Sequence, residues 1–228
     1  MRKGLTELVM ILDRSGSMSG LEADTIGGFN SMIEKQKAEE GDVYVSTILF
    51  DNVSEVIYDR EDIRGIEPMT KRQYYVRGCT ALLDAVGDAI KHISTVHRYA
   101  RKEDVPEKTI FVITTDGLEN ASRKYDYNEV RRMIERQKEL YHWEFIFLGA
   151  NIDAAKEAAR FGINASRAAR YEHNGYGTAL NYSVVSDALT KMRKAESAER
   201  MAKVFEEADA LAPIREYYKA ENEDDIPF

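Results

Sequence analysis

The sequence predicts an α/β fold: a doubly wound, mostly parallel six-stranded sheet with one antiparallel edge strand and helices on both faces. Apolar runs of strand length alternate along the chain with segments whose apolar residues recur at helical spacing. Such alternation places parallel strands in one sheet that helices cover on both sides. The chain has 228 residues, 43% of them hydrophobic, which is enough for one domain with a sizeable core.

The first half of the chain provides three of the predicted strands. Residues 7–12, "ELVMIL", form an apolar run that ends at Asp13 and is followed by a helical face at Ile26, Phe29, Met32 and Ile33. Residues 42–50 and 54–58 flank Asp51-Asn52, which is typical of a hairpin turn, so this pair is expected to be antiparallel. Residues 59–79 show no clear period and are expected to form a loop.

The second half continues the alternation. A helix is expected from Thr80, followed by a buried strand that ends at Asp116, a helical stripe over 130–141 and a strand at 143–151. A short helix over 153–162 is stopped by Gly162, and a weak strand is expected within 163–171. After the turn-rich 172–177, one long charged helix is predicted from about Ser186 to Ala208, ending before Pro213. This gives a domain over 1–210 and an acidic flexible tail over 211–228.

Composition excludes several classes of function. The net charge of −8 argues against a broad surface for nucleic acid or anionic membrane, so neither is an expected partner. The one cysteine, Cys79, excludes an internal disulfide and a thiolate zinc cage and fits a reducing cytosol. The start of the chain, "MRKGLTELVMIL", is a poor signal peptide because its apolar part is short and contains Glu7. A cytoplasmic protein is therefore expected.

Polar residues follow directly on the apolar strands. Asp13, Ser15 and Ser17 come at every second position after the first strand, Asp116 closes a later strand, and Thr80 opens a helix. Strands often end in polar turns and helices often begin with Ser or Asp, so local structure alone could explain each group. In doubly wound sheets, however, sites form outside the carboxyl ends of the strands, where these groups converge.

The converging groups suit a hard divalent cation. Mg²⁺ prefers oxygen ligands in an octahedron and gives up its waters reluctantly. Serine and threonine hydroxyls are neutral ligands, so a cation held mainly by them keeps positive character and an open position. An acidic group from a partner could then complete its coordination. Asp84, four residues after Thr80, is expected either to orient that turn or to act as a first-turn helix carboxylate.

At these residues the sequence resembles the von Willebrand factor type A family. "DRSGSM", the threonine of "GCTALLDA" and the aspartate of "TTDG" are similar to the three parts of that family's metal-ion-dependent adhesion site, over roughly residues 5–165. The resemblance implies hydroxyl ligands at Ser15, Ser17 and Thr80, with Asp13 and Asp116 in direct or water-mediated contact. It also implies Mg²⁺ or Mn²⁺ and a protein partner that supplies Asp or Glu. "DTIGGFNSM" and "LGAN" resemble an intracellular bacterial or phage-type branch.

A binding module is favoured over an enzyme. Haloacid-dehalogenase-type phosphatases need a second aspartate where this chain has Ser15, and the P-loop and Rossmann glycine patterns do not occur. "GSMSG" has a methionine where a nucleophile elbow needs its serine. Metal-dependent hydrolysis stays open as an alternative, because a bound metal can activate water. No histidine or further carboxylate is placed in the sequence as an obvious base.

The stretch "ENEDDIPF" joins acids to an apolar triplet. Asp224, Asp225, Ile226, Pro227 and Phe228 resemble the acidic C-terminal tip of bacterial single-stranded DNA-binding proteins, which that family uses to recruit replication and repair enzymes. The resemblance implies a docking segment for such proteins. The rival interpretation is that the acids bind the metal site of a neighbouring copy, which would give a self-associating scaffold.

Overall fold

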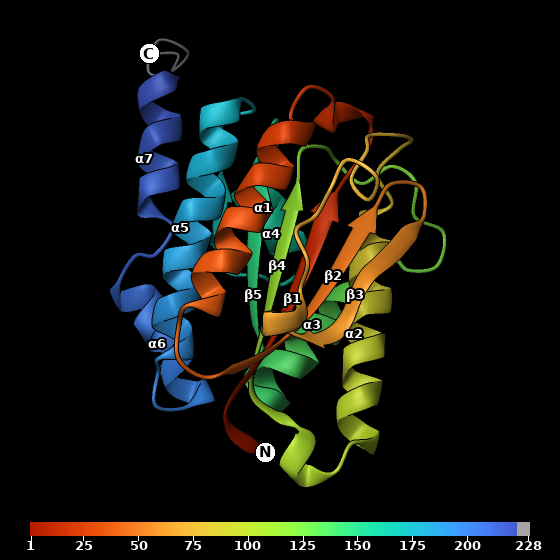
Figure 1. Cartoon of the computed structure of the whole chain (residues 1–228). Helices are drawn as coiled ribbons and strands as arrows, with labels where there is room; N and C mark the ends of the chain where they lie inside the picture. Colours follow the sequence, from red (N-terminus) through yellow and green to blue (C-terminus); the bar gives the residue numbers. More distant parts are fainter. Residues whose placement is uncertain (223–228) are drawn as a thin grey trace.

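The computed structural model describes residues 1–222 (Figure 1). One six-stranded sheet runs through it in the order β3-β2-β1-β4-β5-β6. The strands are β1 (Arg2–Asp13), β2 (Asp42–Phe50), β3 (Ser54–Asp62), β4 (Pro106–Thr115), β5 (Glu144–Gly149) and β6 (Ala168–Arg170). Only the β2–β3 pair is antiparallel, so the predicted parallel sheet with one antiparallel edge strand is confirmed.

Helices cover both faces of the sheet (Figure 1). They are α1 (Glu22–Lys37), α2 (Leu82–Tyr99), α3 (Tyr127–Tyr141), α4 (Ala154–Arg160), α5 (Gly175–Arg193), α6 (Ala198–Glu207) and α7 (Ala212–Glu221). One core cluster joins one face of the sheet to α1, α5, α6 and α7. The other joins the opposite face to α2, α3 and α4.

The central strand β1 shows why the sequence forms this sandwich. Its residues from Leu5 to Asp13 are buried, and successive side chains point to opposite faces of a strand. Leu8, Met10 and Leu12 therefore enter the first cluster, whereas Val9 and Ile11 enter the second. Both faces are apolar, which is characteristic of a parallel strand covered by helices on both sides.

The end of the helical region differs from the prediction. The single helix expected over 186–208 is wrong: α5 begins earlier, at Gly175, and a separate helix begins at Ala198. Asn174 caps α5 by accepting a hydrogen bond from Gly177 N at 2.7 Å, and Ser197 caps α6 by accepting one from Arg200 N at 3.2 Å. Asn174, expected in a turn, and Ser197, expected inside a helix, thus both act as N-caps, a role that asparagine and serine favour.

The acidic tail expected over 211–228 is also corrected in its first part. Residues 212–221 form helix α7, with Pro213 in the first turn, where its missing N–H is not needed. Ile214 of α7 is 1% exposed within the first core cluster. The predicted docking residues 224–228 lie outside the described residues.

No helix within residues 1–222 is long and apolar enough to cross a membrane.

Candidate metal centre

Three segments distant in sequence meet at the carboxyl edge of the sheet, where the strand order reverses between β1 and β4. Asp13 is the last residue of β1, and Ser15 and Ser17 lie in the turn that follows. Asp116 directly follows β4, and Thr80 lies two residues before α2. The structure therefore brings together all five residues that the sequence singled out.

The three hydroxyls form a continuous row that ends at a carboxylate. Thr80 Oγ1 donates to Ser15 Oγ at 3.1 Å, and Ser15 Oγ lies 3.1 Å from Ser17 Oγ. Ser17 in turn donates to Asp116. Ser17 is exposed, whereas the other three members of the row are at most 3% exposed. The row is thus a buried cluster that opens to solvent beside Ser17.

Asp13 is held at both of its carboxylate oxygens. Its Oδ1 accepts a hydrogen bond from Ser15 N at 2.7 Å, and its Oδ2 accepts one from Thr115 Oγ1 at 2.6 Å. Burial nevertheless raises the pKa of Asp13 to about 6, and the neighbouring Asp116 carboxylate adds to the effect. The Asp13 carboxyl is thus buried beside the Asp116 carboxyl, and both burial and this neighbour disfavour its negative charge.

Asp116 has an oxygen that the protein does not satisfy. Within residues 1–222, Asp116 Oδ2 is buried without a hydrogen-bond partner, and burial raises the pKa of this carboxyl as well. A buried acceptor without a partner is strongly unfavourable. Two buried carboxylates beside three hydroxyls fit a hard cation, which would offset their negative charge and bind the free oxygen of Asp116.

The β2–β3 turn holds the Thr80 segment in place. Asn52 Oδ1 accepts a hydrogen bond from Cys79 N at 2.9 Å, and Asp51 O accepts one from Ala81 N at 2.9 Å. Gly78 has φ +72°, and a Cβ there would lie 2.0 Å from Asn52 Oδ1, so the close approach requires glycine. The edge hairpin therefore fixes the backbone on both sides of Thr80.

A buried ion-pair cluster supports the same turn. Arg14 is 0% exposed and donates from Nε to Asp51 Oδ2 at 2.8 Å and from Nη1 to Glu55 Oε2 at 2.7 Å. Arg77 donates to the same Asp51 oxygen at 2.7 Å, and its backbone N donates to Arg14 O at 2.9 Å. The residue that follows Asp13 is thus tied to the segment that leads to Thr80.

Asp84 and Glu119 brace two loops against each other. Asp84 accepts hydrogen bonds from the backbone N–H groups of residues 123–125, at 2.9–3.2 Å. Glu119 accepts one from Leu83 N, in the first turn of α2, at 2.8 Å. Asn120 Oδ1 accepts one from Thr80 N at 2.9 Å. Asp84 therefore orders the loop after β4 and, among residues 1–222, makes no hydrogen bond to Thr80 itself.

Three residues at the site were missed by reasoning from the sequence. Tyr74 OH donates to Asp13 O at 2.6 Å, and Thr115 holds the Asp13 carboxylate. His173 Nδ1 lies 3.4 Å from Asp116 Oδ2 and makes no hydrogen bond there. Thr115 could have been found as the neighbour of Asp116, whereas Tyr74 and His173 lie in irregular loops without a sequence signal.

The donor set is unlike that of a site for thiolate- or imidazole-preferring metals. Within residues 1–222, no group of three or more His, Cys, Asp or Glu side chains gathers to hold a metal ion. The cluster at the sheet edge instead combines two carboxylates with three hydroxyls. Oxygen ligands of this kind suit Mg²⁺ or Mn²⁺ better than thiolate- or imidazole-preferring metals.

Comparison with known proteins identifies the fold. The structure is similar to a von Willebrand factor type A protein from Catenulispora acidiphila, with TM-score 0.53, 12% identity, and 82% of this chain covering 42% of that one. It is also similar to proximal thread matrix protein 1 of the mussel byssus, with TM-score 0.50, 13% identity, and 92% covering 46%. Another structure of the mussel protein has a zinc-occupied metal-ion-dependent adhesion site motif. It matches with TM-score 0.50 and 11% identity, and the match covers 92% of this chain and 46% of that one.

These similarities show a von Willebrand factor type A fold, at identities that establish the fold alone. The chain spans less than half the length of the solved chains it matches. No protein-family model matches the sequence, and no curated protein is significantly similar to it.

Proposed function

We propose that this protein is a metal-dependent protein-interaction module. One Mg²⁺ or Mn²⁺ bound among Ser15, Ser17, Thr80, Asp13 and Asp116 would receive a carboxylate from a partner protein. The observation that carries the proposal is the convergence of three hydroxyls and two buried acids at the open edge of the sheet, with Asp116 Oδ2 left without a partner.

The geometry supports a cation that remains attractive to acids. Both oxygens of Asp13 already accept hydrogen bonds, which favours a role for this carboxylate through water. The hydroxyls of Ser15, Ser17 and Thr80 bring no charge. A cation whose direct ligands are mainly neutral hydroxyls keeps positive character, and the solvent-exposed side at Ser17 is where an Asp or Glu of a partner can approach.

The von Willebrand factor type A fold commonly serves protein–protein interaction, which agrees with this proposal. The mussel protein with zinc in its adhesion-site motif shows that a protein of this fold can hold a metal there. For this chain, the oxygen-only donor set is the argument for Mg²⁺ or Mn²⁺.

Partner capture from cell lysate tests the proposal. The bait is the full chain, in Mg²⁺ or in EDTA, beside Thr80→Ala and Ser19→Ala variants. Ser19 is exposed, follows the site turn and has no recorded side-chain hydrogen bond, so it is the matched control for the loss of a hydroxyl. We expect proteins that bind wild type and Ser19→Ala in Mg²⁺ only. The same bound proteins in every condition would contradict metal-dependent binding.

Metal-assisted hydrolysis is the second candidate, favoured by one observation. His173 lies beside Asp116, where an imidazole could act as a general base toward a bound water. Hydrolysis of phosphoesters or peptides that requires Mg²⁺ and is lost in both Asp13→Ala and His173→Ala would favour the enzyme. We propose binding as the primary function because the site presents neutral hydroxyls around an open position.

The acidic segment 224–228 is proposed as a separate docking element for replication or repair proteins. The proposal rests on its sequence alone. A labelled peptide of residues 214–228 should bind a repair enzyme that recognises single-stranded DNA-binding protein tails, and a peptide without Phe228 should not. Equal binding of both peptides would exclude this docking mode.

A further inference from the structure

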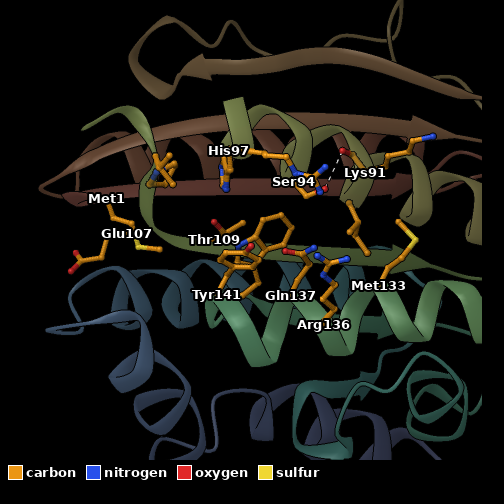
Figure 2. A pocket seen from close by; sticks show the side chains of 15 residues that line it. Met1, Lys91, Ser94, His97, Glu107, Thr109, Met133, Arg136, Gln137 and Tyr141 are labelled. Carbon is orange, nitrogen blue, oxygen red and sulfur yellow. Dashed lines mark hydrogen bonds between the residues drawn. The ribbon is translucent and has the colours of Figure 1, made fainter. Parts of the chain in front are cut away.

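A second site lies at the opposite edge of the sheet from the candidate metal centre. A cavity of about 370 Å³ opens between the second half of α2 and α3, above the start of β4. Figure 2 shows Arg136 and Gln137 of α3 directed toward the helix that carries Lys91, Ser94 and His97. Its volume is in the range of ligand-binding pockets in proteins.

The floor of the cavity is aromatic and contains an unsatisfied polar atom. Trp143 stacks on Phe111 with 5.4 Å between ring centroids, and the His97 ring meets its edge at 5.5 Å. Gln137 is 7% exposed, and its Oε1 is buried with no hydrogen-bond partner among the described residues. An apolar ring with a neighbouring backbone N–H would fill the space and satisfy this acceptor.

The rim of the cavity is basic in an acidic protein. Lys91, Arg98 and Arg136 line it, and among residues 1–222 none of them has a carboxylate partner within 4.0 Å. One acid, Glu107, also lines the cavity and accepts a hydrogen bond from Gly4 N at 3.0 Å. The whole chain has a net charge of −8, so three cations without acidic partners mark a site for an acidic ligand.

We propose that this cavity binds residues 223–228 of a second copy of the chain. That segment, "EDDIPF", has three acids followed by an apolar triplet that contains one aromatic ring. The ring matches the Trp143 floor, and the acids match the basic rim. Proline within the triplet reduces the conformational entropy lost on binding. This inference does not depend on the metal centre.

The reach of the segment argues for a neighbouring copy as its source. Asn222 contacts Glu172, beyond the carboxyl end of β6, and α7 belongs to the core face opposite α2 and α3. The cavity lies at the start of β4, and the six steps along β4 from Thr109 to Thr115 already span about 20 Å. The six residues 223–228, fully extended, also span about 20 Å. They are therefore too short to reach the cavity of their own chain, which lies on the other face of the sheet.

Association of this kind is head-to-tail. The cavity of each copy would receive the segment of the next, so the interface is heterologous and can build open chains of copies. Because the cavity and the metal centre lie at opposite edges of the sheet, the bound segment does not occupy the metal centre of the copy that receives it.

Peptide binding to the full chain tests the site. A labelled peptide of residues 219–228 is titrated onto the Phe228→Ala chain, whose own segment no longer competes. We expect saturable binding that changes the fluorescence of Trp143, the only tryptophan of the chain. Arg136→Glu should weaken binding at least tenfold. Arg132→Glu is the matched control, because Arg132 is exposed on the same helix, does not line the cavity and makes the same charge change.

Three results would overturn the proposal in this titration. One is equal weakening of peptide binding by Arg132→Glu and Arg136→Glu, which would show that the acidic peptide is attracted by positive charge in general and does not occupy the cavity. Another is release of the peptide by EDTA, which would place the acids at the metal centre of the neighbouring copy instead. The third is absence of saturable binding, which would reject both interpretations.

Sedimentation velocity of the full chain provides an independent measurement. We expect wild type to grow into larger species with concentration, and Phe228→Ala and Arg136→Glu each to stay monomeric. A mixture of the two variants should form a pair, because one keeps the cavity and the other keeps the segment. A wild-type chain that stays monomeric up to millimolar concentration, or a mixture that forms no pair, would contradict the proposal.

Discussion

Replacement of Asp13 by asparagine separates the stability of the metal-free site from its capacity to bind a cation. Asparagine has the shape of aspartate but cannot ionise. Its carbonyl oxygen can still accept from Ser15 N, which lies 2.7 Å from Asp13 Oδ1. Its amide can donate to Thr115 Oγ1, whose own hydroxyl can turn to Gly117 O at 3.1 Å. The substitution therefore keeps a partner at both positions where Asp13 makes hydrogen bonds.

The expected magnitude follows from the pKa of Asp13, which burial raises from 3.8 to about 6. The folded state binds this proton more tightly than the unfolded state, so the contribution of Asp13 to metal-free stability is highest at low pH. It falls as the pH rises from about 4 to about 6 and is level above. At about 1.4 kcal/mol per pKa unit, ionisation of Asp13 lowers the free energy of unfolding by about 3 kcal/mol at neutral pH.

Thermal unfolding in EDTA measures this effect. At pH 7.5 we expect Asp13→Asn to be more stable than wild type by about 1–3 kcal/mol, with a melting temperature about 2–4 °C higher for each kcal/mol. At pH 4 the difference should nearly vanish. In Mg²⁺ or Mn²⁺ only wild type should gain stability, by an amount that depends on the ratio of free metal to Kd.

Asp187→Asn is the matched control, because it removes the same charge from an exposed carboxylate that pairs with Lys35. It should change the melting temperature little at either pH, since exposed ion pairs contribute about 0–1 kcal/mol. Destabilisation of the metal-free protein by Asp13→Asn at pH 7.5, or equal metal-induced stabilisation of variant and wild type, would refute the reasoning.

Three further changes test the surroundings of the site. Ser17→Ala should weaken Mn²⁺ binding at least tenfold in a titration followed by electron paramagnetic resonance, whereas Ser19→Ala should leave it unchanged; equal effects would exclude Ser17 as a ligand. Asn52→Ala removes the acceptor of the Cys79 N–H and should reduce the free energy of unfolding by about 1–2 kcal/mol in urea and weaken Mn²⁺ binding too. Unchanged Mn²⁺ affinity in Asn52→Ala would show that the hairpin turn does not hold the Thr80 segment. Gly28→Ala places a Cβ 2.3 Å from the Tyr182 ring between α1 and α5 and should destabilise by about 1–3 kcal/mol without change in metal affinity. A neutral effect on stability would mean that α1 and α5 separate easily.

The sheet and the meeting of the five residues at its edge could be predicted because their signals are local. The apolar run of β1 ends abruptly at Asp13 and that of β4 at Asp116, and parallel strands place such ends at one edge. The single antiparallel pair followed from the Asp51-Asn52 turn. Residue type and position relative to the strand were sufficient for this part of the structure.

The later helices could not be predicted because cap and turn residues are ambiguous in sequence. Asn174 occurs in a glycine-rich stretch typical of turns, yet it caps α5. Ser197 follows residues that favour helix, yet it caps α6. Pro213 can stop one helix or begin the next, and the burial of Ile214 decides for the second.

The missed contacts depend on tertiary structure. Tyr74 and His173 reach the site from loops whose paths are fixed only by the packed fold. The basic rim at Arg136 likewise forms only when α2 and α3 pack side by side. Such juxtapositions have no periodicity that a single sequence could reveal.

Anomalous diffraction from crystals grown with Mn²⁺ locates the cation itself. We expect one strong manganese peak between Ser15 Oγ, Ser17 Oγ and Thr80 Oγ1, with Asp116 in direct or water-mediated contact. The peak should be absent from crystals of Asp13→Ala grown in the same way. Wild-type crystals in millimolar Mn²⁺ without a peak among these side chains would contradict the account.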